Sequence, residues 1–91
     1  MKNQIDRDIF KKTITKWGDE AQYDQMIEEC AELIAVLKHY KRGKVAEAEV
    51  IDELADVVLM AHQLMFMFGE ESVSRAIDKK LDKLRGLLRT A

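Results

Sequence analysis

Hydrophobic residues recur at helical spacing along most of the chain. Apolar side chains three and four positions apart, with polar residues between them, are typical of amphipathic helices. No segment carries the alternation of apolar and polar residues that is typical of a β-strand. The pattern predicts four helices, at residues 4–17, 20–41, 46–68 and 70–89.

Glycines mark the ends of these predicted helices. Gly18, Gly43 and Gly69 fall where the hydrophobic periodicity breaks, and glycine is the usual residue just after a helix ends. The links between the helices are short, which places consecutive helices antiparallel. We therefore expect an all-α fold, an antiparallel four-helix bundle that forms a single domain over residues 1–91.

The third predicted helix is apolar around nearly its whole circumference. A helix of that kind is buried on all sides. A domain of 91 residues can hardly cover such a helix completely by itself. We expect the apolar helices to be shared between copies of the chain, in a homodimer or a homotetramer.

Two acidic clusters lie on the second and third predicted helices. The first is EECAE at residues 28–32, and the second is DELAD at residues 52–56. Taken alone, the first is typical of a solvated helix face. The second lies on the apolar helix, where an unpaired carboxylate is costly unless a cation, a hydrogen bond or a proton compensates it.

The short link between these two helices can bring the acidic clusters face to face. Glu29 and Glu32 lie one turn apart on one helix, and Glu53 and Asp56 lie one turn apart on the other. Carboxylates around one space repel each other unless a hard cation joins them. A set of oxygen ligands suits Mg²⁺, with Mn²⁺ as a substitute, better than zinc.

The composition narrows the class of protein further. The formal net charge is −2 and both signs are spread along the chain, so we expect no nucleic-acid partner. The most apolar segment, residues 55–68, is short and carries polar residues, so we expect no membrane span. A single cysteine and an amino terminus without an apolar signal region lead us to expect a cytoplasmic protein.

The paired acidic clusters resemble those of the all-α nucleoside triphosphate pyrophosphohydrolase superfamily, the MazG-like proteins. The resemblance begins at Trp17-Gly18 and Gln22, includes both clusters, and ends with KLDKL at residues 80–84. It implies a nucleoside triphosphate substrate and Mg²⁺-dependent hydrolysis of an NTP or dNTP to the monophosphate and pyrophosphate. Cleaning of the nucleotide pool is the biological role that it suggests.

The resemblance also implies roles for individual residues. Four acids would bind the metal: Glu29, Glu32, Glu53 and Asp56. Two acids would be catalytic, and either could orient or deprotonate the attacking water: Glu28 and Glu32. Four residues would contact the substrate, two of them near the nucleotide and two at its phosphates: Trp17, Gln22, Lys80 and Lys83.

Two other functions stay open from the sequence. One is a phosphoribosyl-ATP pyrophosphatase, for which we expect a histidine about four residues after the aspartate of the second cluster, where this chain has Met60. The other is a helical oligomerisation or regulatory module without catalysis, against which the intact acids speak. The absence of a glycine-rich Walker loop argues against a P-loop NTPase.

Overall fold

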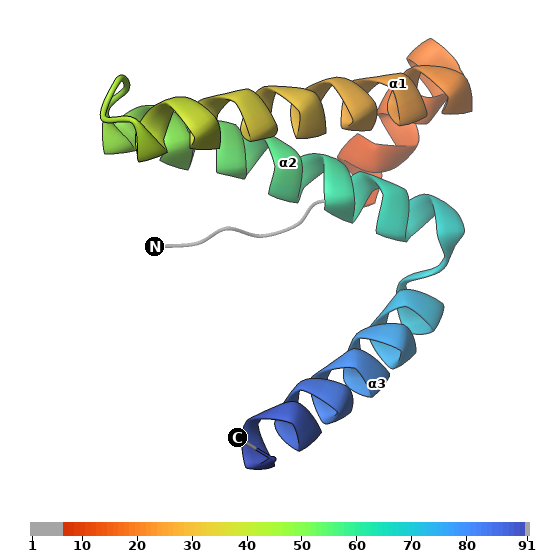
Figure 1. Cartoon of the computed structure of the whole chain (residues 1–91). Coiled ribbons are helices and arrows are strands. Elements are labelled where there is room, and N and C mark those ends of the chain that lie inside the picture. Colours follow the sequence, from red (N-terminus) through yellow and green to blue (C-terminus); the bar gives the residue numbers. More distant parts are fainter. Residues whose placement is uncertain (1–6, 91) are drawn as a thin grey trace.

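The chain folds into three α-helices in the computed structural model, which describes residues 7–90. They are α1 (Arg7–Lys41), α2 (Glu47–Phe68) and α3 (Glu70–Arg89), and no strand occurs among these residues (Figure 1). The predicted all-α class is therefore confirmed. Residues 4–6 of the first predicted helix lie outside the described residues.

A kink at Gly18 joins the first two predicted helices into one. Gly18 has φ 85° and ψ 169°, while the residues on both sides of it are helical. A positive φ is easily adopted by glycine and is strained in residues with a Cβ atom. The glycine thus interrupts the helix as predicted, but the next helical turn follows directly, so that α1 is one bent helix.

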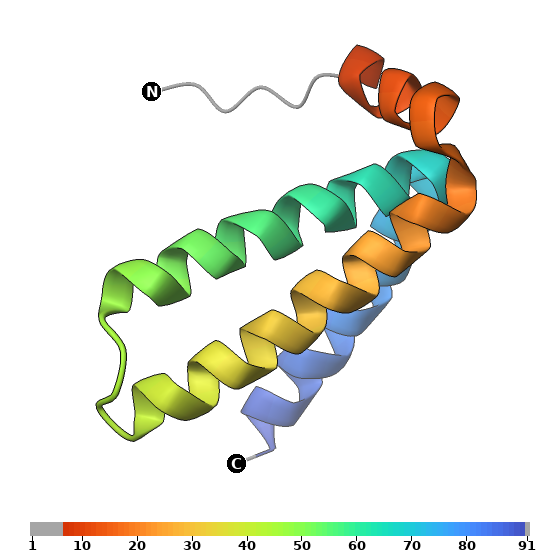
Figure 2. The same cartoon turned by 90° about the horizontal axis from the view of Figure 1, so that it is seen from above.

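The longer arm of α1, after the kink, forms an antiparallel hairpin with α2 (Figure 2). The link between them opens with a turn in which the N–H of Gly43 donates to the carbonyl of Tyr40 at 2.9 Å. Gly43 has φ 70°, the left-handed conformation in which many helices end. The expected antiparallel arrangement of these two helices is confirmed, and it brings the two acidic clusters to one interface.

The short arm of α1, before the kink, lies across the carboxyl-terminal half of α2. The ring of Phe10 packs on that of Phe66 at a centroid distance of 5.9 Å. Three side chains of the described residues are buried, and they all lie in this region: Phe10, Gln22 and Gln63. The small core therefore contains two carboxamides, and both have hydrogen-bond partners.

Helix α3 leaves the hairpin at Gly69 and diverges from it (Figure 1). An ion pair of 2.9 Å between Arg7 and Glu70 ties its first turn to the start of α1. None of the residues of α3 is buried. The described part of one chain thus forms a helical hairpin with an extended third helix, and a four-helix bundle is not closed within one chain.

Large apolar side chains remain exposed on all three helices. On α3 they form one stripe, because residues three and four apart share a helix face. Members of the exposed set are Ile27, Ile34, Leu37, Ile51, Leu54, Val58, Ile77, Leu81, Leu84 and Leu88. Among the described residues, no helix is long and apolar enough to cross a membrane.

Candidate metal centre and adjoining pocket

Three carboxylates meet where α1 and α2 face each other. Glu29 comes from α1, and Glu53 and Asp56 come from successive turns of α2. One oxygen atom of each lies within 4.8 Å of the other two. We call this cluster the acidic triad; it joins the two sequence clusters as the helical spacing predicted.

One oxygen of the triad is buried without a hydrogen-bond partner. Glu53 is half-buried, and its Oε2 atom is shielded from solvent and has no hydrogen-bond partner while the carboxyl groups are charged. A buried carboxylate oxygen without a partner is costly, and a proton or a cation can offset that cost. The residues present are therefore suited to a divalent cation with oxygen ligands.

The electrostatics of the triad favour added positive charge. Burial raises the pKa of Glu53 to about 7, and its hydrogen bond with Glu29 and the nearby negative charges add to the rise. The same hydrogen bond is the main cause that lowers the pKa of Glu29, and Gln25 adds to it. Burial, then the charges of Glu29 and Asp52, raise the pKa of Asp56. The metal-free triad thus holds a proton near neutral pH that a cation can replace.

Glu32 lies beside the triad without completing it. It is exposed on α1, and loss of hydration, followed by the charge of Glu29, raises the pKa of its carboxyl group. Glu28 is also exposed, and its charge contributes to the shift at Glu32. The structure therefore brings together three of the four predicted metal ligands and leaves Glu32 and Glu28 at the rim.

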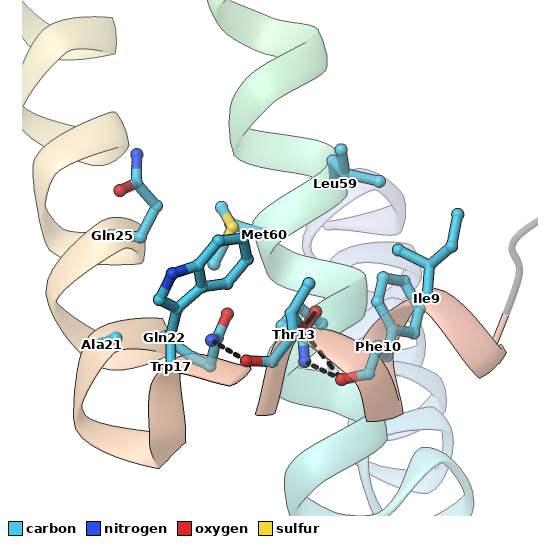
Figure 3. Close-up of a pocket in the computed structure, with 10 residues that line it drawn as sticks. Ile9, Phe10, Thr13, Trp17, Ala21, Gln22, Gln25, Leu59 and Met60 are labelled. Carbon is cyan, nitrogen blue, oxygen red and sulfur yellow. Dashed lines mark hydrogen bonds between the residues drawn. The ribbon is translucent and has the colours of Figure 1, made fainter. Parts of the chain in front are cut away.

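A largely apolar pocket of about 450 Å³ opens between the two arms of α1 and α2 (Figure 3). Two of the predicted substrate residues, Trp17 and Gln22, line it. The side chain of Trp17 is 60% exposed, so the indole is available to a ligand. The other lining residues are Ile9, Phe10, Thr13, Ala21, Gln25, Leu59, Met60 and Gln63.

A hydrogen-bond network fixes the floor of this pocket. The Thr13 hydroxyl lies 2.9 Å from Gln63 Oε1 and 2.8 Å from the carbonyl oxygen of Phe10. Gln63 Nε2 donates to the same carbonyl at 3.2 Å. Sequence reasoning missed both Thr13 and Gln63. A carboxamide on an otherwise apolar helix was the signal, because a buried polar group needs partners.

The pocket and the triad adjoin each other. Gln25 lines the pocket, and its Nε2 donates to Glu29 Oε2 at 2.8 Å. Met60, another lining residue, follows Asp56 by one turn of α2. A molecule in the pocket can therefore extend toward the triad without leaving the surface of the hairpin.

The two predicted phosphate ligands lie on another element. Lys80 and Lys83 are exposed on α3. The first turn of α3 contacts α1 through the ion pair of Glu70 with Arg7, and the rest of α3 diverges from the hairpin. Within one chain, α3 does not bring these lysines to the triad.

No protein-family model, curated protein or solved structure matches the chain.

Proposed function

We propose that the protein is a Mg²⁺-dependent nucleoside triphosphate pyrophosphohydrolase, which converts an NTP or dNTP to its monophosphate and pyrophosphate. The observation that carries this proposal is the convergence of Glu29, Glu53 and Asp56 around a buried, unpartnered carboxylate oxygen. The resemblance of both acidic clusters to MazG-like proteins supports it. A role in cleaning the cytoplasmic nucleotide pool is part of the proposal, and the free Cys30 suits a reducing compartment.

The triad is the proposed metal site. Its ligand atoms are all carboxylate oxygens, the donors that Mg²⁺ and Mn²⁺ prefer over softer ligands. Three acids leave coordination positions for water and phosphate oxygens, as is usual for Mg²⁺ in nucleotide enzymes. A bound Mg²⁺ supplies positive charge for the phosphates and lowers the pKa of a coordinated water.

Glu32 is the best-placed general base at the rim of the triad. In the proposed reaction, water attacks a phosphorus, its proton passes to a carboxylate, and the bond to the bridging oxygen breaks to release pyrophosphate. A raised pKa makes Glu32 a stronger proton acceptor than an ordinary glutamate. Glu28 is the second candidate, and the Glu28→Gln and Glu32→Gln variants separate the two through their pH–rate profiles.

The apolar pocket is the proposed site for the nucleobase. Trp17 offers an aromatic face on which a flat heterocycle can stack. The Nζ atom of Lys16 lies 5.0 Å from the centre of the indole and is not part of the pocket lining. Because Gln25 links the pocket to Glu29, a base in the pocket leaves its phosphates directed toward the triad.

A homodimer or homotetramer is the proposed working form. The apolar stripe of α3, with Leu81 and Leu84, is exposed, and among residues 7–90 no helix covers it. Contiguous exposed apolar surface of this kind marks a protein interface. A second copy packed on α3 is also the route by which Lys80 and Lys83 can approach bound phosphates.

The test is hydrolysis of a nucleotide panel by the purified protein. NTPs, dNTPs and phosphoribosyl-ATP are incubated with and without Mg²⁺, and monophosphate and pyrophosphate are measured. We expect equimolar monophosphate and pyrophosphate only with the metal, and almost none from a Glu53→Gln variant. Silence across the panel from a folded protein would reject the proposal, and turnover confined to phosphoribosyl-ATP would replace the proposed substrate.

A further inference from the structure

Gln22 is a buried carboxamide whose orientation is fixed by the kink in α1. Its side chain is 6% exposed, and its Nε2 lies 3.3 Å from two carbonyl oxygens, those of Thr13 and Gly18. Both neighbours are acceptors, so the NH₂ group must face them. The opposite orientation would place oxygen against oxygen.

This orientation leaves the Gln22 oxygen for the pocket. In Figure 3 the Gln22 nitrogen faces the Thr13 carbonyl, and the Gln22 oxygen lies on the side of Trp17 and Met60. It has no hydrogen-bond partner among the described residues, and it is not among the atoms sealed from solvent. The pocket therefore presents an acceptor, without the accompanying donor that a freely turning glutamine offers.

The carboxamides of Gln25 and Gln63 do not add a free amide donor beside the Gln22 oxygen. Gln63 is occupied on both ends, by the Thr13 hydroxyl and by the Phe10 carbonyl. The Nε2 of Gln25 is committed to Glu29. The carboxamide donors of Gln22, Gln25 and Gln63 each have an acceptor in the hairpin, whereas the Gln22 oxygen remains unused at a largely apolar wall. The indole N–H of Trp17 is a further donor of the lining.

We propose that the pocket selects nucleobases that carry an exocyclic amino group on the edge opposite the sugar, namely cytosine and adenine, through the Gln22 oxygen. This inference rests on the proposed function, because phosphates held at the triad direct the sugar outward and the far edge of the base inward. The N4 amino group of cytosine or the N6 amino group of adenine then donates to Gln22. Uracil and hypoxanthine place a carbonyl oxygen at the same point, where two acceptors oppose each other.

The expected discrimination follows from the cost of an unpaired buried acceptor. A site that hydrogen-bonds a substrate donor rejects the analogue without it, because its own polar group is left unpaired. For a single neutral hydrogen bond, the preference is about tenfold to hundredfold. We expect this ratio between dCTP and dUTP, and again between dATP and dITP, in kcat/KM of the wild-type enzyme.

Fluorescence of Trp17 provides a readout that does not depend on catalysis. Trp17 is the single tryptophan of the chain and lines the pocket, so a stacked base should quench its emission. The monophosphates dCMP and dUMP serve as probes. We expect half-maximal quenching by dCMP at a concentration at least about tenfold lower than that needed for dUMP.

A Gln22→Met variant tests the assignment to this residue, with Gln25→Met as its matched control. Methionine keeps the length of the side chain and removes the carboxamide oxygen, so the amino preference should fall to near unity. Gln25→Met should lower turnover of both bases together and keep their ratio, because Gln25 contacts Glu29 at the triad. Circular dichroism checks that both variants are folded. If Gln22→Met does not fold, the kcat/KM ratios of the wild type for dCTP against dUTP and for dATP against dITP still test the proposal.

The outcomes separate this inference from the proposed function. Hydrolysis without an amino preference would overturn the inference and leave the proposed function in place. Absence of hydrolysis, with selective quenching of Trp17 by dCMP, would reject the proposed function and support the pocket's selectivity. Equal quenching by dCMP and dUMP, or an amino preference that persists in folded Gln22→Met, would overturn the inference.

Discussion

The α1–α2 hairpin and helix α3 differ in where their apolar surface goes. The hairpin contains the buried side chains, the pocket and the acidic triad. Helix α3 is strongly amphipathic, yet none of its residues is buried. The buried Gln63 of the hairpin has hydrogen-bond partners in the same chain, whereas Leu81 and Leu84 of α3 are exposed in the part of the chain that the structure describes.

This contrast assigns different roles to the two regions. We expect the hairpin to position the chemistry, because two helices hold carboxylates and carboxamides close together. We expect helix α3 to offer an interface, because a helix with one apolar stripe is stabilised when that stripe is covered. The following experiments test the division, from the largest expected effect to the smallest.

The largest effect is expected in the triad of the hairpin. Glu53→Gln keeps the shape of the side chain and removes a charged ligand. Loss of even an outer partner of a metal ligand costs 10-fold to 100-fold in many enzymes, so we expect kcat/KM to fall by at least about 100-fold. The measurement is pyrophosphate release with saturating Mg²⁺.

The matched control for this loss is Asp24→Asn. Asp24 is an exposed acid of α1 outside the triad, so activity should stay within about twofold of wild type. Equal losses in the two variants would mean that general negative charge, and not the triad, supports the reaction.

A second experiment charges the apolar stripe of α3. Leu81→Asp places a carboxylate where we expect a subunit contact, and we expect the dissociation constant of the oligomer to rise tenfold to about 100-fold. Light scattering should then follow the molar mass toward the 10.5 kDa of one chain upon dilution.

The control on the same helix is Lys79→Asp, on the side opposite the stripe. It should leave the assembly unchanged, since Lys79 is exposed and lies about half a turn from the apolar residues. A wild-type protein that is already monomeric at high concentration would refute the interface role of α3.

Two glycines allow a third comparison, between the kink of α1 and the body of α3. Gly18 has φ 85°, and no atom stands within 4 Å of a Cβ placed there, so backbone strain alone opposes a side chain. We expect Gly18→Ala to cost about 1–3 kcal/mol of unfolding free energy. Gly86 is helical, and Gly86→Ala should stabilise by about 0.5–1 kcal/mol. Urea denaturation measures both, and opposite signs are the result required.

The smallest effect concerns pH and the metal-free triad. Because the pKa of Glu53 is raised to about 7, its proton stabilises the folded state at low pH, and this stability is lost as the pH rises toward 7. Glu29 shifts in the opposite direction, and its contribution changes only below its ordinary value of 4.5. The melting temperature should therefore fall between pH 5 and pH 8 without metal.

This pH dependence has two internal checks. Glu53→Gln cannot lose a proton, so its melting temperature should vary less over the same interval. Added Mg²⁺ should raise the melting temperature of the wild type most at pH 8, where the carboxylates are charged. A melting temperature that rises with pH in the metal-free protein would contradict the assignment of the proton to Glu53.

Much of this arrangement could be predicted from the sequence, for physical reasons that differ by residue. The helices follow from apolar periodicity, and the short link at Gly43 makes α1 and α2 antiparallel. That hairpin is enough to bring Glu29 toward Glu53 and Asp56. Glu32, one turn after Glu29 on α1, is exposed and lies outside the triad, a difference that the helical spacing alone does not decide.

The pocket and the course of α3 could not be predicted in the same way. The pocket depends on the backbone angles of Gly18, which decide how the short arm of α1 crosses α2. The floor of the pocket depends on the contact between Thr13 and Gln63, which are 50 residues apart in the sequence. No local sequence pattern predicts this contact. The direction of α3 after Gly69 is weakly determined among the described residues, because none of the residues of α3 is buried against the hairpin.

Metal binding tests the central claim most directly, because the proposed hydrolysis depends on a cation held by the triad. Mn²⁺ can be titrated into the metal-free protein at pH 8 and followed by calorimetry and electron paramagnetic resonance, with Mg²⁺ as competitor. We predict saturable binding in the wild type and in Asp24→Asn, with loss of at least about 10-fold in affinity in Glu53→Gln. Equal affinity of the wild type and folded Glu53→Gln would contradict the assignment of Glu29, Glu53 and Asp56 as one cation site.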